Sequence, residues 1–370
     1  MILVFSGYTT CEKAVIYLEH FSCGGKIVTG AGAVAVLKDM NPGRTFVVTD
    51  PFFYQSGTAQ ALVGEGAEFF HKVAPDPDLE LAAQGTAALQ KFNPDTVVAL
   101  GGGSAMDCAK AMVYFSGTKA RLIAIPTTSG SGSEVTDFAI LTHNGVKHPL
   151  IDPRLRPDMA IVDSDLVVKL PPALIADGGF DVLTHAAEAF VATGSGPFSD
   201  ALAADSFRTV FQGLRASFQG DLVARAKIHA ASTMAGLAFT QAGLGLCHGL
   251  SHSLGGRFHI PHGRLNAILL PAVMARTPAQ KYGELARRAG LESLSDTVAA
   301  RNLRTALIGL RKGIGLPATL AQAGVCPDAV RKQTPEIVAA TLADPCCKTS
   351  PVPVTAELVK EILQEVTGHG

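Results

Sequence analysis

Short apolar runs rich in β-branched residues alternate with helix-compatible stretches through roughly the first 165 residues of the chain. Strands that alternate with helices predict an α/β fold built on a parallel sheet. The expected strands and helices, in chain order, are a strand, glycine turn and helix start at 25–37, a strand at 44–50, a helix at about 57–66, a strand within 68–78, a helix at 79–92, a strand at 95–101 followed by a helix capped by Ser104, and a strand at 121–126.

After residue 165 the β-branched runs almost vanish, and Ala, Leu, Gln and Glu dominate segments of helical period. The change falls around Leu166–Ala173 and is marked by Pro171–Pro172. A chain of 370 residues is also long for one hydrophobic core, so two domains are the expectation. We therefore predict an α/β domain over residues 1–168 and an all-helical domain over residues 169–370.

Two loops of small residues follow successive predicted strands. The first is Gly101-Gly102-Gly103-Ser104, and the second runs from Pro126 to Glu134 as PTTSGSGSE. Backbone N–H groups at a helix N-terminus bind phosphate, and glycine lets the ligand approach closely. Taken singly, a triple glycine is as readily a tight turn, it is not the G-x-G-x-x-G fingerprint, and Ser/Gly runs are usually surface loops. Two such loops together favour a dinucleotide.

Asp50 ends the first strong strand and precedes Pro51. A carboxylate in this position can accept hydrogen bonds from the adenosine ribose and would repel a 2′-phosphate, which favours NAD over NADP. The plainer reading is a turn aspartate before proline. The functional reading is slightly favoured.

Aspartate and histidine residues recur at helical spacing in the second half. Asp181 and His185 are four residues apart, as are His248 and His252, and the stretch Ala242–Gly263 holds four of the chain's 11 histidines. Residues four apart share a helix face, and a carboxylate with several imidazoles suits a divalent transition metal. Spacing alone does not choose the ligands, because one histidine could shuttle protons and others could bind backbone carbonyls.

Charge and cysteine usage exclude several classes of function. The net charge of −1 gives no reason to propose a nucleic acid or an anionic membrane as partner. We expect no secretory signal in the first 20 residues, because no basic region precedes an apolar one, and no apolar run reaches the roughly 20 residues of a membrane span. The seven cysteines lack paired spacing, which predicts reduced thiols, an inert Cys346–Cys347 pair and a cytoplasmic protein.

Four segments together resemble the iron-containing (group III) alcohol dehydrogenases. They are GGGSAMDCAK (101–110), PTTSGSGSEVT (126–136), DVLTHAAEAF (181–190) and AGLGLCHGLSHSLGGRFHIPHGRLNAILLP (242–271). The resemblance runs from about Gly24 to the C-terminal helix. Within the family, the chain is most similar to the propanol and ethanol dehydrogenases of bacterial microcompartments.

The resemblance implies a dehydroquinate synthase-like fold, with an N-terminal dinucleotide-binding domain, a helical domain and a metal in the cleft between them. The implied metal ligands are Asp181, His185, His248 and His262. His252 would line the site and take part in proton transfer, whereas His259 would be structural or lie behind the ligands. The implied cofactor contacts are Gly102, Gly103, Ser104, Asp107, Thr127, Thr128, Ser131, Lys147 and Phe239.

The implied activity is reversible hydride transfer between NAD(H) and a short-chain primary alcohol or aldehyde, with Fe²⁺ or Zn²⁺ as the metal. The substrate would be 1-propanol/propionaldehyde or ethanol/acetaldehyde, and the enzyme a homodimer or larger homo-oligomer, with microcompartment proteins as candidate partners. Ser131, Ser251 and Ser253 depart from the usual family residues and could alter the pocket. A lactaldehyde reductase or 4-hydroxybutyrate dehydrogenase is the near alternative; a glycerol dehydrogenase or dehydroquinate synthase, a metal-dependent hydrolase and an inactive scaffold are more distant ones.

Overall fold

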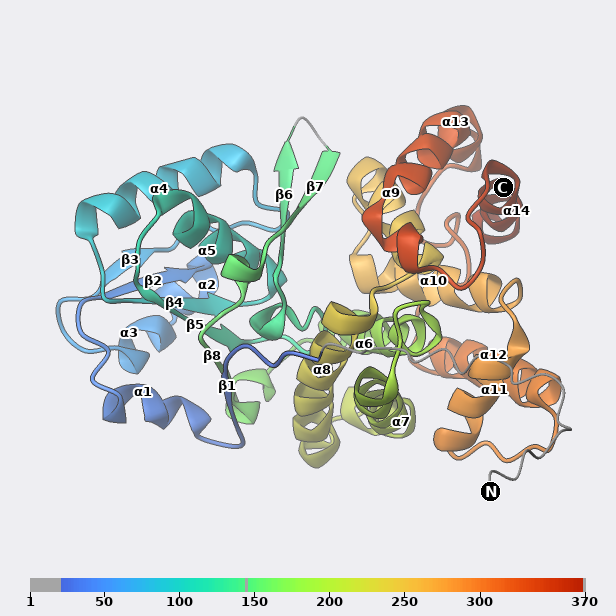
Figure 1. Ribbon diagram of the computed structural model, residues 1–370, viewed down its shortest axis with the longest axis horizontal. Coiled ribbons are helices and arrows are strands. Elements are labelled where there is room, and N and C mark those ends of the chain that lie inside the picture. Colours follow the sequence, from blue (N-terminus) through green and yellow to red (C-terminus); the bar gives the residue numbers. More distant parts are fainter. Residues whose placement is uncertain (1–20, 144–145, 369–370) are drawn as a thin grey trace, which may run out of the picture.

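The computed structural model describes residues 21–143 and 146–368, which form an α/β part and a helical part (Figure 1). Within these residues the α/β part holds a six-stranded parallel sheet in the order β1-β8-β5-β4-β2-β3. The predicted fold class is therefore confirmed. The strands of this sheet are β1 (Lys26–Thr29), β2 (Thr45–Thr49), β3 (Glu68–Phe70), β4 (Thr96–Gly101), β5 (Arg121–Pro126) and β8 (Met159–Val162).

Helices cover both faces of the sheet. In β2 the side chains of Phe46 and Val48 join one buried cluster and that of Val47 joins another, as the two-residue period of a strand requires. The first cluster includes residues of α4 (Leu79–Phe92) and α5 (Gly103–Ser116), and the second includes residues of α1 (Val36–Asp39) and α3 (Thr58–Leu62). Burial on both faces explains why the strand sequences are continuously apolar.

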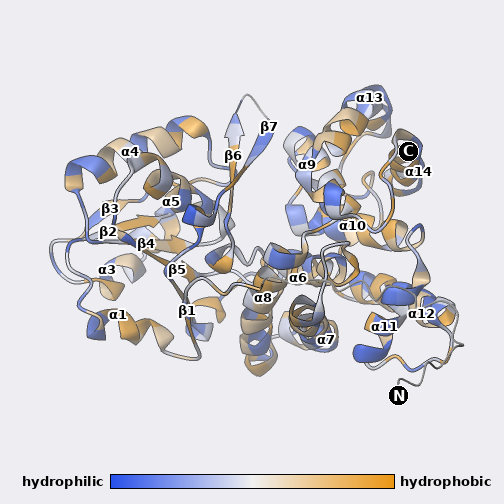
Figure 2. Cartoon of the chain, viewed as in Figure 1, coloured by the Kyte–Doolittle hydropathy of each residue, from blue (hydrophilic) through white to orange (hydrophobic). Residues whose placement is uncertain are grey.

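Helices make up the remainder of the described chain after β8, as predicted. The first long one, α6 (Pro172–Val191), lies at the centre, and sixteen of its 20 residues are buried. Figure 2 shows hydrophobic residues along the sheet strands and α6, and more hydrophilic ones on outer helices such as α11 and α13. None of the helices in the described residues is long and apolar enough to cross a membrane. The other helices are α7 (Pro197–Phe218), α8 (Leu222–Ala242), α9 (Leu246–Phe258), α10 (His262–Met274), α11 (Ala279–Arg288), α12 (Asp296–Gly313), α13 (Pro327–Ala343) and α14 (Ala356–Thr367), with short 3-10 helices η1 (Ala33–Ala35), η2 (Ser133–Val135), η3 (Pro153–Leu155), η4 (Ser164–Val167) and η5 (Pro345–Thr349).

Several local predictions need correction. The predicted helix at 57–66 is only α3, which follows Gly57 at a φ of 76°, and the short helix α2 (Pro51–Gln55) before it was not predicted. The strand expected within 68–78 is only β3, because Asp78 already caps α4 by accepting from Leu81 N. Ser104 does not cap α5: the helix begins at Gly103, its N-cap is Gly102, and no side chain caps it. The division of domains at residue 168 remains a prediction.

A two-stranded antiparallel hairpin, formed by β6 (Phe138–His143) and β7 (Val146–Ile151), was not predicted. It leaves the sheet and projects between the two parts of the molecule, so that β7 contacts α9 (Figure 1). The sequence signal is weak because Pro149 interrupts β7, a residue that strands tolerate at edges. The hairpin forms a wall of the cleft between the α/β and helical parts.

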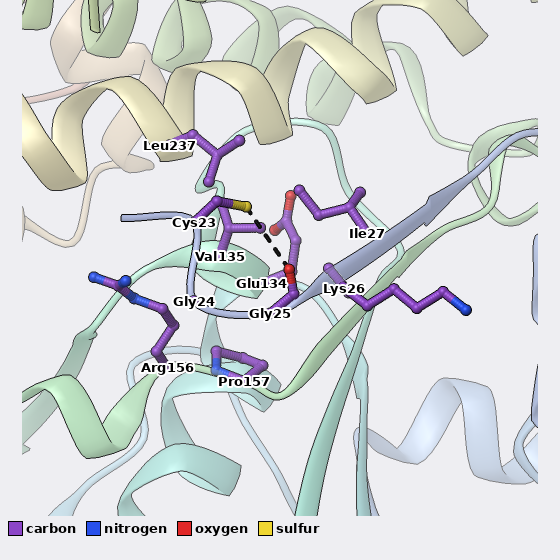
Figure 3. Close-up of a pocket in the computed structure, with 11 residues that line it drawn as sticks. Cys23, Gly24, Gly25, Lys26, Ile27, Glu134, Val135, Arg156, Pro157 and Leu237 are labelled. Atoms are coloured by element: carbon purple, nitrogen blue, oxygen red, sulfur yellow. Dashed lines mark hydrogen bonds between the residues drawn. The ribbon is translucent and has the colours of Figure 1, made fainter. Parts of the chain in front are cut away.

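A close approach of two glycines and a neighbouring hydrogen bond join the α/β part to the helical part. A Cβ on Gly132 would lie 2.7 Å from Gly236 Cα, so only glycine lets this loop touch α8. Beside it, buried Glu134 accepts a 2.6 Å hydrogen bond from Thr233 Oγ1 of α8. Figure 3 shows the same junction from the side of Cys23–Ile27, with Leu237 of α8 over Glu134 and Val135. These contacts fix α8 against the α/β part.

Proline inside a helix explains the position of one buried cation. Pro271 lies within α10 and has no N–H, so the carbonyl of Ala267 four residues earlier lacks its helical donor. Arg311 of α12 is buried and donates from its guanidinium to this carbonyl at 3.1 Å. Arg311 thus satisfies a buried acceptor that the helix itself cannot.

Replacing Arg311 with Met should therefore lower the free energy of unfolding by about 1.5–3 kcal/mol, the range for a hydrogen bond from a charged donor. Chemical denaturation at fixed metal loading measures the change. Lys312→Met is the matched control, because Lys312 is the exposed cation of the same last turn and should cost no more than about 0.5 kcal/mol. Equal losses in the two variants would mean that charge at the helix end, rather than the Ala267 carbonyl, is what matters.

Candidate metal centre and nucleotide cleft

Two of the predicted metal ligands come from one face of α6. Asp181 and His185 are one helical turn apart and both are buried. His185 Nε2 lies 3.9 Å from Asp181 Oδ1. The helical spacing seen in the sequence therefore places both side chains on the same face, as expected.

The other two predicted ligands come from α9 and α10. His248 Nε2 lies 3.9 Å and His262 Nε2 3.5 Å from Asp181 Oδ1. One ligand atom from each of the four side chains lies within 4.8 Å of every other. Ligands at about 2.1 Å from a common ion lie roughly 3.4 Å apart in a tetrahedron. The donor set and its spacing therefore fit a divalent transition metal.

Burial sets the charge of these groups. It lowers the pKa of His185 to about 3 and the pKa values of His248 and His262 well below the usual range. All three imidazoles are therefore neutral near pH 7, with a lone pair available for a metal. Burial also raises the pKa of Asp181 to about 7. A buried carboxylate among neutral imidazoles favours a bound cation.

Glu188 holds His248 in position, and the sequence analysis missed it. The buried Glu188 carboxylate accepts from the backbone N–H groups of Gly245, Cys247 and His248, and from His248 Nδ1 at 2.5 Å. With Nδ1 donating to Glu188, Nε2 of His248 is left as the acceptor that faces Asp181. A carboxylate behind a histidine is the usual way of orienting a metal ligand. The signal was present, because Glu188 is three residues after His185 on the same helix face.

Asn266 of α10 is a second supporting residue that the sequence analysis did not find. Its fully buried amide donates to Asp181 Oδ1 at 2.8 Å and lies 3.4 Å from His248 Nε2. Ser251 in turn donates to the Asn266 carbonyl oxygen. The substitution noted at Ser251 therefore fixes the orientation of an amide behind the ligands rather than lining the pocket.

The remaining histidines of the Ala242–Gly263 stretch differ in role. His252 is not among the four clustered ligands; its ring stacks on that of His262 at 5.2 Å, and its Nδ1 lies 2.9 Å from Asp344 Oδ2. His259 is exposed and ends α9 in the left-handed region, at a φ of 53°. His259 is therefore structural, which is one of the two roles expected for it.

The two predicted nucleotide loops lie side by side because β4 and β5 are neighbours, with Gly101 opposite Pro126. Thr127 N donates to the Gly101 carbonyl at 2.9 Å. A Cβ on Gly102 would lie 3.2 Å from Thr128 Oγ1, and one on Gly103 3.1 Å from Ser131 Oγ. Ser104 follows in the first turn of α5. The loops form one surface of small residues and backbone at a helix N-terminus.

Asp50 directly follows β2, and because β2 is the neighbour of β4 in the sheet, Asp50 lies next to these loops. Its Oδ1 accepts from Phe53 N at 3.0 Å and caps α2, whereas its Oδ2 faces Gly101, 3.7 Å from where a Cβ would lie. The turn reading of Asp50 is thus correct, yet the cap leaves the second oxygen on the side of the glycine loop. Capping of α2 by Asp50 is therefore compatible with its predicted role in binding the adenosine ribose.

Three further predicted cofactor contacts, Phe239, Asp107 and Lys147, each have different neighbours. Phe239 stacks on His185 at 4.5 Å. Asp107 is held by Ser133 Oγ and Ile140 N, and burial raises its pKa. Lys147 pairs with Asp76 at 2.7 Å.

A cavity of about 360 Å³ connects the metal ligands with part of the predicted nucleotide surface. Its lining includes all four predicted metal ligands together with His252, Asp107, Ser131 and Phe239. The structure therefore brings these side chains together at one cleft. The glycine loop, Asp50, Thr127, Thr128 and Lys147 lie outside the lining of this cavity.

Lys110, the last residue of the GGGSAMDCAK segment, anchors the predicted nucleotide loop after β5 to the β6–β7 hairpin, a role that the sequence did not reveal. Its buried ammonium donates to Ser133 Oγ, Thr136 Oγ1 and the carbonyls of Thr136 and Phe138, all within 2.9 Å. Burial lowers its pKa to about 8, while nearby Asp107 opposes the shift. This lysine holds together two walls of the cleft.

A parallel α/β part joined to a helical part that clusters three imidazoles and a carboxylate fits a metal-dependent enzyme. The family described as iron-containing alcohol dehydrogenase matches residues 24–164, and its C-terminal counterpart matches residues 175–367. The chain belongs to the iron-containing alcohol dehydrogenase family, as the sequence motifs indicated.

Two curated relatives cover nearly all of the chain. It is 40% identical to the 1-propanol dehydrogenase PduQ of Citrobacter freundii, over 94% of this chain and 100% of that protein. It is 35% identical to the NADPH-dependent butanol dehydrogenase of Clostridium saccharobutylicum, over 94% of this chain and 97% of that protein. The family relationship therefore spans both halves of the molecule.

Two solved structures superpose closely on this fold. The iron-containing alcohol dehydrogenase from Thermococcus thioreducens has a TM-score of 0.87 at 32% identity, covering 94% of this chain and 99% of that one. Sulfoacetaldehyde reductase from Bifidobacterium kashiwanohense in complex with NAD+ has a TM-score of 0.84 at 29% identity, covering 96% and 100%. The predicted fold class is thus shared with structures of this family.

Replacing Glu188 with Gln should weaken metal binding by about 10- to 100-fold, because an amide cannot accept all the N–H groups that converge on the carboxylate. Competition with a chelator of known affinity measures the change. Asp177→Asn is the matched control: Asp177 precedes Asp181 by one turn of α6 and binds Arg264 rather than a histidine. An unchanged metal affinity in Glu188→Gln, with the fold intact, would show that Glu188 does not position His248.

Proposed function

We propose that this protein is an NAD(H)-dependent alcohol dehydrogenase that interconverts short-chain primary alcohols and their aldehydes with the help of a bound divalent metal. The observation that carries the proposal is that the four clustered ligands open into the same cavity as Phe239 and the loop after β5. That cavity would join the proposed metal position to part of the proposed nucleotide surface. The names of the propanol and butanol dehydrogenase relatives support the substrate class.

The site's own residues would divide the work as follows. Asp181, His185, His248 and His262 would hold the ion, with Glu188 and Asn266 fixing the orientation of their ligand atoms. The bound ion supplies a Lewis acid for the alcohol or aldehyde oxygen. The nicotinamide carries the hydride, and the protein supplies position. Apolar side chains of the hairpin and α8, including Phe138, Ile140 and Phe239, would exclude water from the reacting carbon.

His252 would accept the alcohol proton during oxidation and return it during reduction. Its Nδ1 is held by Asp344, so that Nε2 is the nitrogen left to exchange a proton. The stacking of His252 on His262 keeps the ring beside the metal position. Substrate oxygen, ligand histidine and proton acceptor would then lie within one small cavity.

Asp50 would select NAD by accepting hydrogen bonds from the adenosine ribose, since a 2′-phosphate there would meet a carboxylate. Its free Oδ2 on the side of Gly101 supports this assignment. Gly102, Gly103, Ser104, Thr127 and Thr128 would receive the pyrophosphate, and Lys147, held by Asp76, would stand at the edge of the hairpin. Iron is the metal that the family name favours, and zinc suits the same ligands.

The family resemblance noted in the sequence is the basis for two further proposals, that the enzyme is cytoplasmic and housed in a bacterial microcompartment, and that it is a homo-oligomer. Both assignments are extensions of the proposed function. No nucleic-acid partner is proposed.

The proposed function is tested by anaerobic NADH oxidation with acetaldehyde, propionaldehyde, lactaldehyde and succinic semialdehyde, after loading with Fe²⁺ or Zn²⁺ and with NADPH run alongside. We expect turnover of the short unbranched aldehydes with NADH, because the cavity is small and largely apolar. Turnover confined to lactaldehyde or the semialdehyde would keep the family and change the substrate. No turnover with either metal would remove the proposed function.

Two histidine variants separate the proposed roles. His262→Ala should reduce bound metal and activity together, because it removes a ligand. His252→Ala should lower activity by about 100-fold or more, the usual contribution of a positioned acid–base group, while bound metal stays constant. Metal analysis by mass spectrometry on each purified variant, beside the aldehyde assay, makes the comparison. Full metal occupancy in His262→Ala would show that the ligand set is wrong.

A further inference from the structure

A second group of metal-binding side chains faces the same cavity. His252 of α9, Asp344 between α13 and η5, and Cys346 of η5 each offer one ligand atom within 4.8 Å of the other two. His252 and Cys346 both line the cavity of about 360 Å³. We propose that these three side chains form a second metal site, which takes a thiophilic divalent cation such as Zn²⁺ or Cd²⁺.

The three donors are held in position by hydrogen bonds at the start of η5 and from there to α9. Asp344 is the N-cap of η5, and its Oδ1 accepts from the backbone N of Cys346 at 2.9 Å. Its Oδ2 lies 2.9 Å from His252 Nδ1. One carboxylate therefore fixes the thiol-bearing residue on one side and the imidazole on the other. None of the three side chains is fully buried, so a cation can reach them from the cavity.

The ligand types suit zinc. A nitrogen, an oxygen and a sulfur from the protein leave a fourth position for water, as in open zinc sites. The first cluster contains no sulfur, whereas thiolate in the second favours Zn²⁺ and Cd²⁺ over Fe²⁺. The two sites would therefore prefer different metals although they share one cavity.

The charge balance at this group also favours a cation. A divalent ion between the Cys346 thiol and the Asp344 carboxylate would form a metal–sulfur bond as the thiol proton leaves to solvent, and its charge would balance those of the thiolate and the carboxylate. The imidazole of His252 is the only ion-pair partner of Asp344 among the described residues.

Occupation of the second site would stop the proposed reaction. The cation would bind His252 through the nitrogen that now faces Asp344 and would place a charge in the cavity. Excess Zn²⁺ would then inhibit an enzyme whose first site already holds iron. The binding itself does not depend on the proposed function, because none of its three ligands needs substrate or nucleotide.

The neighbouring cysteine provides a matched control. Cys347 Sγ donates to the Thr341 carbonyl at 3.1 Å and packs against Gly249, so it is not a member of the group. A Cys346→Ser change removes the proposed sulfur ligand, and Cys347→Ser removes the adjacent one. The two variants are changed at adjacent positions, and each replaces one cysteine sulfur with oxygen.

The test is a Cd²⁺ titration of the metal-loaded protein, followed by ultraviolet thiolate-to-cadmium absorption and by metal content after gel filtration. Wild type and Cys347→Ser should bind one more Cd²⁺ per chain than Cys346→Ser and show the thiolate band, which Cys346→Ser should lack. Asp344→Asn should weaken this binding by at least tenfold. Zn²⁺ at the same excess should inhibit aldehyde reduction in wild type and not in Cys346→Ser.

Equal cadmium content and equal absorption in wild type and Cys346→Ser would overturn the proposal. Loss of the band in both serine variants would also overturn it, since the adjacent thiols rather than His252 and Asp344 would then be the ligands. The thiolate-to-cadmium absorption band is measured without any turnover of aldehyde by the enzyme. Its appearance in a protein that reduces no aldehyde would leave the second site standing and remove only the proposed function.

Discussion

The buried carboxylate of Glu188 is the interaction on which the metal centre depends. It joins α6 to the start of α9 by collecting three backbone N–H groups and the ring of His248. Burial raises its pKa to about 7 even though these donors favour the charged form and oppose the rise. Because α6 also supplies Asp181 and His185, one helix carries two ligands and the group that orients a third. The candidate site is thus centred on one buried helix, to which α9 contributes His248 and α10 contributes His262.

The cleft exists because the two parts of the molecule are joined by contacts that leave little freedom between them. Gly132 against Gly236, and Glu134 against Thr233, hold the nucleotide loop to α8. Phe239, on the same helix, then stacks on His185. Lys110 holds the other side of the loop to the β6–β7 hairpin. The distance between the predicted nucleotide loops and the four clustered ligands is therefore set by closely packed contacts between these elements.

The sequence was sufficient for the features that depend on local spacing. The limits of α4, the strands β2, β4 and β5, and the pairs Asp181/His185 and His248/His252 all follow from periodicity within one segment. It was insufficient where a contact joins distant segments: Glu188 meets His248 across 60 residues, Asn266 meets Asp181 across 85, and Asp344 meets His252 across 92. The hairpin was missed because Pro149 weakens its strand signal, and the Ser104 cap was wrong because glycine begins that helix without a side-chain cap.

The position of His252 between two groups of ligands limits what the cavity can do. Its ring stacks on His262, a member of the first group, while its Nδ1 is bound by Asp344, a member of the second. A histidine held in this way can pass a proton only as long as Asp344 accepts from it rather than sharing it with a cation. The arrangement that would orient His252 as a proton acceptor would therefore also make it a ligand of the proposed second metal site, which contains the sulfur of Cys346. If the second group binds a cation as proposed, the identity of the metal in the first site and freedom from metal in the second would be two separate requirements for activity.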